Sequence, residues 1–344
     1  MRDVAAAAGV STMTVSNVLS GRRPVSEETR AAVLGAVERL GYQVNVAARS
    51  LRRGRTGVVG LAVPALDSPY FSQLAGRLVE RLAREGLRVV VEQTGASREG
   101  EAAAVRDSRV NAYDGLVLSA VGLGAGDVRA LAGDLPVVAL GERQDLRRVD
   151  HVGMANVEGA RAAAGLLLER GCRRLAVVGS PPWDRLDEPG DHGGDAFRLR
   201  ALGAREAVRA VPAASARALA PGTLLEDGVR CGRELALAAD PVDGVVALTD
   251  TLALGVLRGL ADAGLRVPDD VLVVGFDDVR EASASVPSLS TVSPGHDEMV
   301  EAVVRLLLRR MADPAAEPEE VFGPFVLLER ESTRPAGRSL APGR

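Results

Sequence analysis

The sequence predicts a mixed α/β protein, in which a small all-α head precedes two similar lobes that are each built on a parallel β-sheet. Three observations predict this: three short helical patterns at the start, strands alternating with helices beyond residue 55, and a repeat of the strand pattern. A chain of 344 residues suits two or three domains better than one core. Its 47% hydrophobic and 26% charged residues are typical of a soluble globular protein.

Three helices are expected in the head. The first runs from Asp3 to Ala8, and Gly9-Val10-Ser11 forms a tight turn into a second helix, Thr12 to Leu19, with Ser11 as its N-cap. The third helix begins at Ser26 and is ended by Gly41. Apolar residues at helical spacing would pack together as the core of the head: Val33, Val37 and Leu40 against Val4, Val15 and Val18. Short helices joined by a glycine turn predict a helix-turn-helix domain.

The body repeats its strands in order. The repeat distance is about 120–135 residues, far too long for a solenoid, so it predicts two α/β lobes. A cleft between lobes is a favoured ligand site. The matching segments are Val58–Pro64 with Leu175–Pro181, Asp114–Leu118 with Asp243–Leu248, and Leu135–Leu140 with Val271–Phe276.

These patterns divide the chain into parts. The expected parts are a head (1–42), a hinge or linker (43–56), a two-lobed core (57–334) and a disordered tail (335–344) rich in Pro, Gly and Arg. Within the core we expect lobe one at about 57–152 and 292–314, and lobe two at about 153–291 and 315–334.

Charge is distributed unevenly. Residues 1–55 contain nine arginines and four acidic residues, a net charge of +5, so the rest of the chain carries −9. A basic head on an acidic body suggests that the head meets a polyanion. The chain has no lysine, which suits bidentate phosphate contacts, although a biased genome composition explains it better.

Composition argues against several classes of protein. No apolar run approaches the roughly 20 residues that cross a bilayer, and the first residues lack a signal-peptide core, so we expect a cytoplasmic protein that does not bind membranes. Cys172 and Cys231 alone provide neither a disulfide framework nor a zinc site. With 3 histidines and no suitable carboxylate cluster, we expect no enzyme activity, no metal and no cofactor.

Two other classes share parts of this pattern. The run Gly122–Gly126 follows a strand and Glu142 lies 20 residues on, as in a dinucleotide site, but Asp127 places an anion where the pyrophosphate would lie and is better interpreted as a helix N-cap. A transporter's solute-binding protein would share the two lobes, but it would need an export signal and would have no use for a basic helix-turn-helix.

Short motifs recur along the chain in a fixed order: Asp3-Val4-Ala5, Ala8-Gly9-Val10-Ser11, Thr14-Val15-Ser16, Val25–Arg30, Ala47–Leu51, Arg198-Leu199-Arg200, Ala253-Leu254-Gly255 and Val274–Asp278. In these motifs the sequence resembles the LacI/GalR (lactose repressor) family over essentially its whole length. The resemblance implies a DNA-binding head, a hinge helix and a two-lobed core like that of periplasmic sugar-binding proteins. Family members are mostly homodimeric repressors that respond to small metabolites.

The sequence also departs from the family pattern. Family members usually begin several residues earlier, with a threonine that caps the first helix, so we expect either an upstream start or a frayed first turn at Met1. Gly141-Glu142 and Thr249-Asp250 differ from what many sugar-binding members carry at these positions. The C-terminal tetramerising heptads are absent, which favours a homodimer.

The second helix is expected in the major groove. Thr12, Met13, Ser16 and Asn17 would face the bases, since Asn can pair with adenine and Met can press on a thymine methyl. Ser11, Thr14, Arg22 and Arg23 would contact phosphates. The alternative is that these are ordinary solvated residues of a surface helix.

Residues 45–51 would form the hinge helix. The resemblance places Leu51 as an apolar wedge in the minor groove, beside Asn45, Arg49, Arg52 and Arg53. So short a helix is unstable alone in water, so it would form only when paired across a dimer on DNA. A basic flexible linker is the alternative.

Five residues are candidate effector ligands: Asp67, Phe71, Arg200, Thr249 and Asp277. Ligands sit at the C-terminal ends of parallel strands, where Asp67, Phe71 and Asp277 are expected. The resemblance places Arg200 at the position where family members hold effector oxygens. Tyr70 is better interpreted as a core residue, and an intramolecular Arg200–Asp277 pair, with Asp278 as a competing partner, is the alternative to effector binding. The loop 181–196, which carries the only tryptophan, Trp183, could be a lid or merely exposed.

These features together predict a homodimeric transcriptional repressor whose partners are double-stranded operator DNA and a small metabolite, a sugar or a sugar derivative such as a sugar phosphate. A purine-sensing repressor and an activator of the same architecture remain alternatives.

Overall fold

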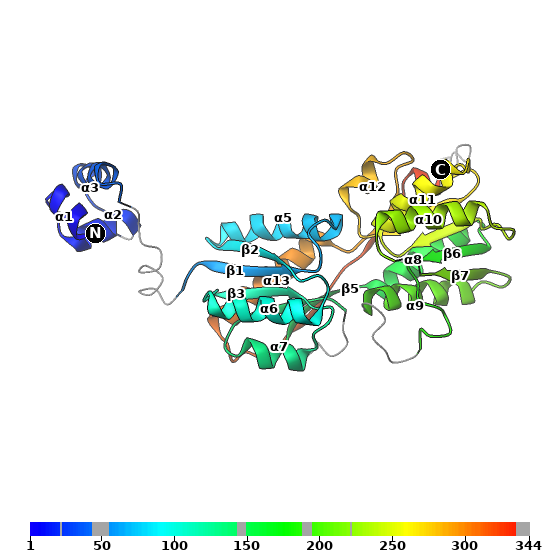
Figure 1. The fold of residues 1–344 in the computed structure, drawn as a ribbon, viewed down its shortest axis with the longest axis horizontal. Helices are drawn as coiled ribbons and strands as arrows, with labels where there is room; N and C mark the ends of the chain where they lie inside the picture. The colour runs from blue at the N-terminus through cyan, green and yellow to red at the C-terminus, as the bar shows by residue number, and fades with distance from the viewer. Residues whose placement is uncertain (21–22, 43–54, 143–148, 188–194, 221, 335–344) are drawn as a thin grey trace, which may run out of the picture. The chain divides into compact units, whose positions relative to one another are not determined.

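The computed structural model describes residues 1–20, 23–42, 55–142, 149–187, 195–220 and 222–334. It contains two compact units, Met1–Thr56 and Gly57–Arg344, which we describe separately (Figure 1). The predicted tail, 335–344, and nearly all of the predicted hinge, 43–56, lie outside the described residues.

The first unit is the predicted three-helix head. Its helices are α1 (Arg2–Ala8), α2 (Thr12–Ser20) and α3 (Glu27–Arg39). Gly9 turns the chain after α1 with a φ of 63°, which a residue without a Cβ adopts easily. The Ser11 hydroxyl accepts a hydrogen bond from the Thr14 N–H (3.0 Å), as expected of the N-cap of α2. Ser26 caps α3 in the same way.

The head has a small apolar core. Its buried residues are Val4, Ala5, Val15, Val18, Val33 and Ala36, and Val37 packs against them. The prediction that Leu40 joins this core is wrong, because Leu40 is 49% exposed. Helix α3 ends at Arg39, and Leu40 is its C-cap, where the chain leaves the helix; the buried residues of α3 are Val33 and Ala36.

The second unit contains two parallel sheets, as predicted. Within the described residues, the first sheet has six strands in the order β11-β5-β4-β3-β1-β2 and defines the first lobe. All of its neighbouring strands are parallel. Its elements are β1 (Val58–Val63), α5 (Pro69–Arg84), β2 (Arg88–Gln93), α6 (Arg98–Val110), β3 (Gly115–Ser119), α7 (Ala125–Ala132), β4 (Val137–Leu140), β5 (Asp150–Met154), α13 (His296–Ala312) and β11 (Glu320–Gly323).

The second lobe repeats this design. Its sheet, again six strands among the described residues, has the order β12-β10-β9-β8-β6-β7, and only β12 runs antiparallel to its neighbour. Its elements are α8 (Asn156–Glu169), β6 (Arg174–Val178), α9 (Asp195–Arg209), β7 (Ser215–Leu219), α10 (Leu225–Ala236), β8 (Gly244–Ala247), α11 (Asp250–Asp262), β9 (Leu272–Phe276), α12 (Arg280–Ala284), β10 (Ser290–Ser293), β12 (Val326–Leu328) and the 3₁₀ turn Glu331–Thr333.

Each predicted pair of repeated segments occupies the same place in its sheet. Strand β1 matches β6, β3 matches β8, and β4 matches β9 in strand order. The second pair of repeated segments begins with an aspartate in each lobe, and both aspartates accept hydrogen bonds from backbone N–H groups. Asp114 accepts a hydrogen bond from the Gly57 N–H (2.7 Å), and Asp243 accepts from the Arg173 and Arg174 N–H groups (3.0 and 2.9 Å).

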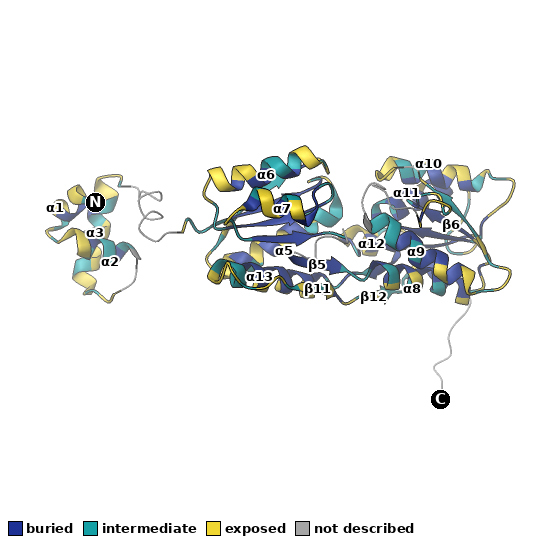
Figure 2. Ribbon diagram, turned by 90° about the horizontal axis from the view of Figure 1, so that it is seen from below, coloured by how far each residue is buried: buried dark blue, intermediate teal, exposed yellow. Residues whose placement is uncertain are grey.

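Helices cover both faces of each sheet, which explains why the strands read as continuous apolar runs. In the first lobe α5 and α13 pack on one face, and α6 and α7 on the other. In the second lobe the two faces are covered by α8 with α9 and by α10 with α11. Figure 2 shows the strands as buried layers between helices whose outer faces are exposed.

The chain crosses between the lobes near the boundaries that the sequence predicts, except at the last crossing. It leaves the first sheet after β5, and it returns to the first lobe between β10 and α13. The expectation assigned all of 315–334 to the second lobe, but β11 pairs with β5 in the first sheet. The last passage therefore follows Gly323, because the edge of the first sheet is completed before β12 joins the second.

Close contact between α10 and α11 depends on glycine. A Cβ added at Gly255 would lie 2.2 Å from the Leu225 carbonyl oxygen, within a tightly packed backbone. We expect Gly255→Ala to lower the free energy of unfolding by about 2–3 kcal/mol, because the helices would have to separate. Gly76→Ala on α5, where a Cβ would meet nothing within 4 Å, is the control and should raise it by about 1 kcal/mol. Equal stability of the two variants in urea unfolding would contradict the prediction.

Candidate functional site

The outer face of α2 is available for contact. Its Val15 and Val18 are buried in the head core, whereas Thr12 is exposed and Met13 is 70% exposed. Ser16 and Asn17 are half-buried. The N-terminal half of α2 thus presents polar side chains and one long apolar side chain, the set that reads base edges in a major groove.

The start of α2 is suited to a phosphate. The hydroxyls of Ser11 and Thr14 lie 2.9 Å apart at this helix N-terminus, where backbone N–H groups favour anions. Arg23, another predicted phosphate contact, is exposed. The remaining predicted DNA contacts, Arg22, Asn45, Arg49, Leu51 and Arg52, lie outside the described residues.

In the core, Arg200 and Asp277 form a buried ion pair. The Arg200 Nη1 atom lies 2.9 Å from the Asp277 Oδ1 atom, and each residue is 5% exposed. This is the intramolecular pair that the sequence left as the alternative to effector binding. Asp278, the other candidate partner, instead pairs with Arg330 at 2.7 Å.

Other groups hold the Arg200 guanidinium in place. It donates to the Asn156 side-chain oxygen (2.7 Å) and to the Leu248 carbonyl oxygen (2.6 Å). Its Nη2 atom lies 3.4 Å from the Met154 sulfur, and its central carbon lies 3.8 Å above the Phe276 ring. The Arg200 guanidinium, which projects from α9, is therefore held by most of its donors.

Asp277 is held in an uncommon backbone conformation. It follows β9 with a φ of 116°, and Asp278 has a φ of 52°. Burial raises the pKa of Asp277, while the neighbouring Arg200 charge opposes that rise. The carboxylate thus lies at the C-terminal end of a parallel strand, where ligands of such sheets bind.

Thr249 and Asp250 have structural tasks at the start of α11. The Thr249 hydroxyl accepts from the Leu252 N–H (3.2 Å) and caps the helix. Asp250 is fully buried and accepts from the Thr291 hydroxyl (2.6 Å) and the Val279 N–H (2.9 Å). Burial, and then the nearby Asp277 charge, raise the pKa of Asp250 well above its ordinary value.

This raised pKa predicts a pH dependence of stability. Between pH 4 and its folded-state pKa, Asp250 binds more protons in the folded than in the unfolded protein, so the free energy of unfolding falls as pH rises through this window. Asp250→Asn lacks this titration. Urea unfolding at pH 4, 5.5 and 7 should therefore show the parent's stability relative to Asp250→Asn decreasing as pH rises. A constant difference would show that Asp250 does not titrate there.

The first lobe contributes Tyr70 at the start of α5. Tyr70 packs against apolar clusters of both lobes, and its ring centroid lies 6.0 Å from that of His296. Burial, and next the Asp277 charge, raise the pKa of Tyr70. Predicted Phe71 packs on the first-lobe core, and Asp67 is exposed in the preceding loop. Tyr70 thus packs in the core, as the sequence analysis expects, with its ring near that of His296.

Gln73 and His296 connect the first lobe to the segment that carries Asp277. Gln73 donates to the Asp278 carbonyl oxygen (3.2 Å) and accepts from the Arg280 N–H (3.2 Å). His296 Nε2 donates to the Asp277 carbonyl oxygen at 2.7 Å. A change in the position of Asp277 would therefore be transmitted to α5 and α13 of the first lobe.

A cavity of about 430 Å³ lies beside the Arg200 partners. Met154 and Asn156, which contact the guanidinium, also line this cavity. Its volume is in the range of small-molecule sites. The other lining residues are Glu142, His151, Ala155, Val157, Glu158, Leu199, Glu320 and Phe322.

Three sequence families match successive parts of the chain. Bacterial regulatory proteins of the lacI family match residues 1–45. Periplasmic binding proteins and the sugar binding domain of the LacI family match residues 56–185, and a periplasmic binding protein-like domain matches residues 164–333. The ribose operon repressor of Halalkalibacterium halodurans is 30% identical over 97% of this chain and 97% of its own length.

The chain belongs to the LacI family. Solved structures agree with this: a LacI-family transcriptional regulator from Sanguibacter keddieii is 38% identical, covers 81% of this chain and 99% of its own, and has a TM-score of 0.71. The Lac repressor dimer bound to operator and the anti-inducer ONPF is 25% identical, covers 96% and 98%, and has a TM-score of 0.79. The predicted family, fold class and DNA-binding regulatory function are confirmed.

The glycine-rich run Gly122–Gly126 of this LacI-family chain binds a carboxylate of the same chain. The buried Glu101 carboxylate accepts hydrogen bonds from the Val121, Gly122 and Leu123 N–H groups (2.8–2.9 Å), so the loop is occupied by a carboxylate of the chain itself. Asp127 was expected as an N-cap, but Gly124 is the N-cap. Asp127 stands three residues later, accepts from the Gly124 N–H and pairs with Arg98.

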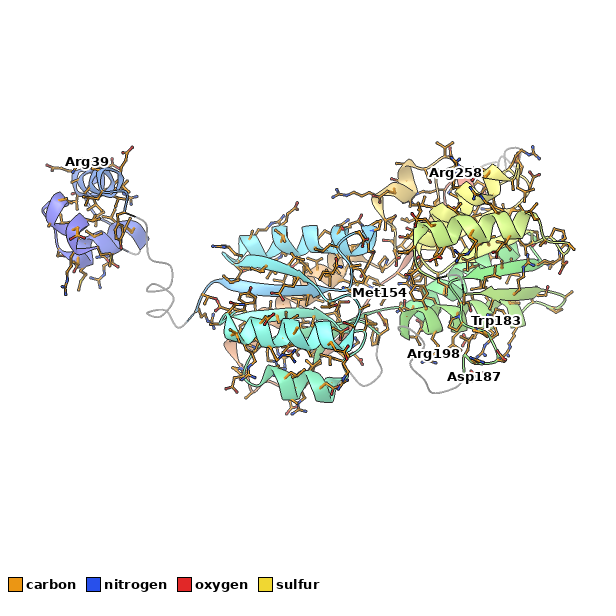
Figure 3. The ribbon with its side chains drawn as sticks, viewed as in Figure 1. Arg39, Met154, Trp183, Asp187, Arg198 and Arg258 are labelled. Carbon is orange, nitrogen blue, oxygen red and sulfur yellow. The ribbon has the colours of Figure 1, made fainter. Side chains whose placement is uncertain are left out.

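Trp183 is anchored rather than freely exposed. It packs against the second-lobe core, and Arg205 donates to its carbonyl oxygen (3.1 Å) and pairs with Asp187 (2.6 Å). Figure 3 shows Trp183 and Asp187 on the same segment, with Met154 at the end of β5. Residues 188–194 of the predicted loop lie outside the described residues.

Sequence reasoning missed three residues of this LacI-family site: Asn156, Gln73 and His296. A signal existed only for Asn156, which stands two residues beyond the end of β5, as Asp277 stands directly beyond β9. Gln73 and His296 reach the site from separate helices, and no local pattern marks them.

Among the described residues, no helix is long and apolar enough to cross a membrane.

Proposed function

We propose that this protein is a cytoplasmic, homodimeric repressor that binds operator DNA through α2 and is controlled by a small metabolite near Arg200 and Asp277. The observation that carries the proposal is the union, in one chain, of a head with an exposed recognition face and a core with a buried ion pair beside a 430 Å³ cavity. Ser11, Thr12, Met13, Thr14, Ser16, Asn17 and Arg23 are the proposed DNA contacts in the described head.

Similarity supports the class of effector. The matching family of residues 56–185 is described as a sugar binding domain, and the relative from Halalkalibacterium halodurans is a ribose operon repressor. We therefore propose a sugar or sugar derivative as the effector, in preference to a purine. Asp277 and Arg200 would accept from and donate to its hydroxyls, and Tyr70 would close the site from the first lobe.

Control of DNA binding requires a difference in affinity between lobe arrangements. Gln73 and His296 hold the Asp277 segment to the first lobe, and Gly57, the first residue of that lobe, is clamped by Asp114. A ligand that binds Asp277 would thus alter the position of the first lobe, which directly follows the hinge in the chain. Dimerisation would convert this change into a change of hinge spacing.

The test begins with selection of duplexes from a randomised DNA library by the full chain. A homodimer of this kind should select a palindrome whose half-sites are about one helical turn apart. The selected duplex is then titrated with the chain in the presence of ribose, other sugars and nucleobases. A sequence with one half-site, or no change of DNA affinity with any compound, would contradict the proposal, and a response to nucleobases alone would favour a purine sensor.

A further inference from the structure

The turn that carries Asp277 needs support from its surroundings. Asp277 and Asp278 follow β9 with φ values of 116° and 52°, and residues with a Cβ seldom adopt such positive values. Two of them in succession persist only where neighbouring groups hold the backbone in place. The contacts of this turn therefore determine where the Asp277 carboxylate lies.

The side chain of Asp250 holds the end of this turn. It is 0% exposed at the start of α11, and its two oxygens accept hydrogen bonds from the Val279 N–H (2.9 Å) and the Thr291 hydroxyl (2.6 Å). The Thr291 hydroxyl in turn accepts from the Asp278 N–H (3.4 Å). Asp250 and Thr291 thus bind the two backbone N–H groups that follow Asp277.

The sheet has room for the Asp250 carboxylate. Gly275 of β9 and Thr291 of β10 stand opposite each other in the sheet. A Cβ added at Gly275 would lie 2.2 Å from the Asp250 Oδ1 atom, so the carboxylate rests against the bare backbone of β9 and on the Thr291 hydroxyl. A larger residue at position 275 would displace Asp250, and the turn would lose the group that holds it.

The charged groups near Asp250 are paired with one another. Arg200 pairs with Asp277 (2.9 Å). Arg330 pairs with Asp278 (2.7 Å), so hydrogen bonds, and no ion pair among the described residues, hold Asp250. Burial raises the pKa of Asp277, and Arg200 and, more weakly, the Asp250 backbone N–H oppose that rise. Asp250 therefore acts on Asp277 through its own N–H and through the turn that its side chain holds.

We propose that Asp250 and Thr291 are positioning residues for Asp277: they fold the turn so that its carboxylate forms the buried ion pair and is presented to the effector. Both side chains are fully buried, so they act through Asp277 and make no contact with the ligand. The part of this inference that concerns the effector rests on the proposed function, whereas the placement of Asp277 against Arg200 does not. Loss of the Thr291 hydroxyl would free the Asp278 N–H and let the turn relax, which carries the carboxylate away from the guanidinium.

The first test is a double-mutant cycle on the full chain, measured as the shift in the urea midpoint of core unfolding. Thr291→Val removes the hydroxyl at nearly constant size. Arg200→Met leaves the Asp277 carboxylate buried without its partner, and the resulting shift should be at most half as large in the Thr291→Val background, where the turn can already move. Thr291→Ser keeps the hydroxyl and should restore the full shift.

Thr333→Val is the matched control. Thr333 is a fully buried threonine of the same lobe, but its hydroxyl bonds to that of Ser290 (2.7 Å) and not to the turn. Arg200→Met should therefore shift the midpoint equally in the parent and in Thr333→Val. If Thr291→Val fails to fold, Asp250→Asn takes its place in the cycle with the same expected result, because it keeps the size of the side chain but turns an amide N–H₂ group toward one of the two donors.

The second test measures binding of ribose, the sugar named in a similar repressor, by calorimetry on the full chain. Thr291→Val should weaken it at least about tenfold, whereas Thr291→Ser and Thr333→Val should remain within about twofold of the parent. Equal shifts from Arg200→Met in the parent and Thr291→Val backgrounds, or unchanged ribose affinity in Thr291→Val, would overturn the inference. If the parent binds no ribose, that result counts against the proposed effector, and the cycle alone decides whether Asp250 and Thr291 position Asp277.

Discussion

Arg200→Ala is expected to abolish effector binding and to lower the free energy of unfolding of the core by about 3–5 kcal/mol. The loss is large because Asp277, 5% exposed, would keep a buried carboxylate without its partner, and the Asn156 and Leu248 oxygens would lose their donor. The cost should shrink at acid pH, since burial raises the pKa of Asp277 and protonation removes the uncompensated charge. Urea unfolding at pH 7 and pH 4.5 measures both effects.

Two further variants test whether the loss of stability comes from the unpaired buried charge of Asp277. Arg161→Ala breaks the exposed pair with Glu206 and should cost no more than about 1 kcal/mol. The double variant Arg200→Met with Asp277→Leu removes both charges and should recover much of the stability, but not effector binding. If Arg200→Ala unfolds at the urea concentration of the parent, the ion pair contributes nothing and its place in the site is doubtful.

Much of the core could be predicted because its signals are local. Strands buried on both faces need apolar runs such as Val58–Val63, and a second copy of the same strand series implies a second sheet. The edge of each sheet was harder to predict. Strand β11 (Glu320–Gly323) is short and only partly buried, and it is separated by about 165 residues from its partner β5, so neither periodicity nor spacing assigns it to a lobe.

The candidate site could be predicted only in part. Asp277 was predicted because a carboxylate at the end of an apolar strand is costly unless it is paired or ligand-bound, whereas Arg200 was predicted from the family resemblance. The structure shows that the two side chains meet. That Thr249 uses its hydroxyl as a helix cap follows from hydrogen-bond geometry, which the sequence does not contain. The same holds for Gln73, whose two bonds to the Asp278 and Arg280 backbones join segments 205 and 207 residues apart.

In the head, the error at Leu40 has a simple physical cause. Helical spacing places residues 33, 37 and 40 on one face, but this rule holds only while the helix continues. The chain turns at Gly41 with a φ of 55°, so the side chain of the last residue is directed away from the core. Helical spacing predicts which residues share the buried face of a helix, but that face ends where the helix ends.

Asn17→Ala is expected to weaken binding to the preferred operator by about 1–3 kcal/mol, roughly five- to 150-fold, and to relax base preference at one position in each half-site. Asn17 lies on the same helix as the exposed Met13, and a bidentate pair with adenine is the specific contact that its amide can make. Titration against operator variants with each base at each position measures the effect.

Arg23→Ala is the matched control for Asn17→Ala, because an exposed arginine beside a helix-turn-helix positions the head without reading bases. It should weaken all operator variants alike and reduce the slope of log affinity against log salt by about 1. Asn17→Ala should leave that slope unchanged, since an uncharged side chain releases no counterions. If Asn17→Ala instead binds every variant as the parent does, α2 does not read bases through Asn17. Thr12 and Met13 would then be the next residues to substitute, because they are the exposed side chains at the start of α2.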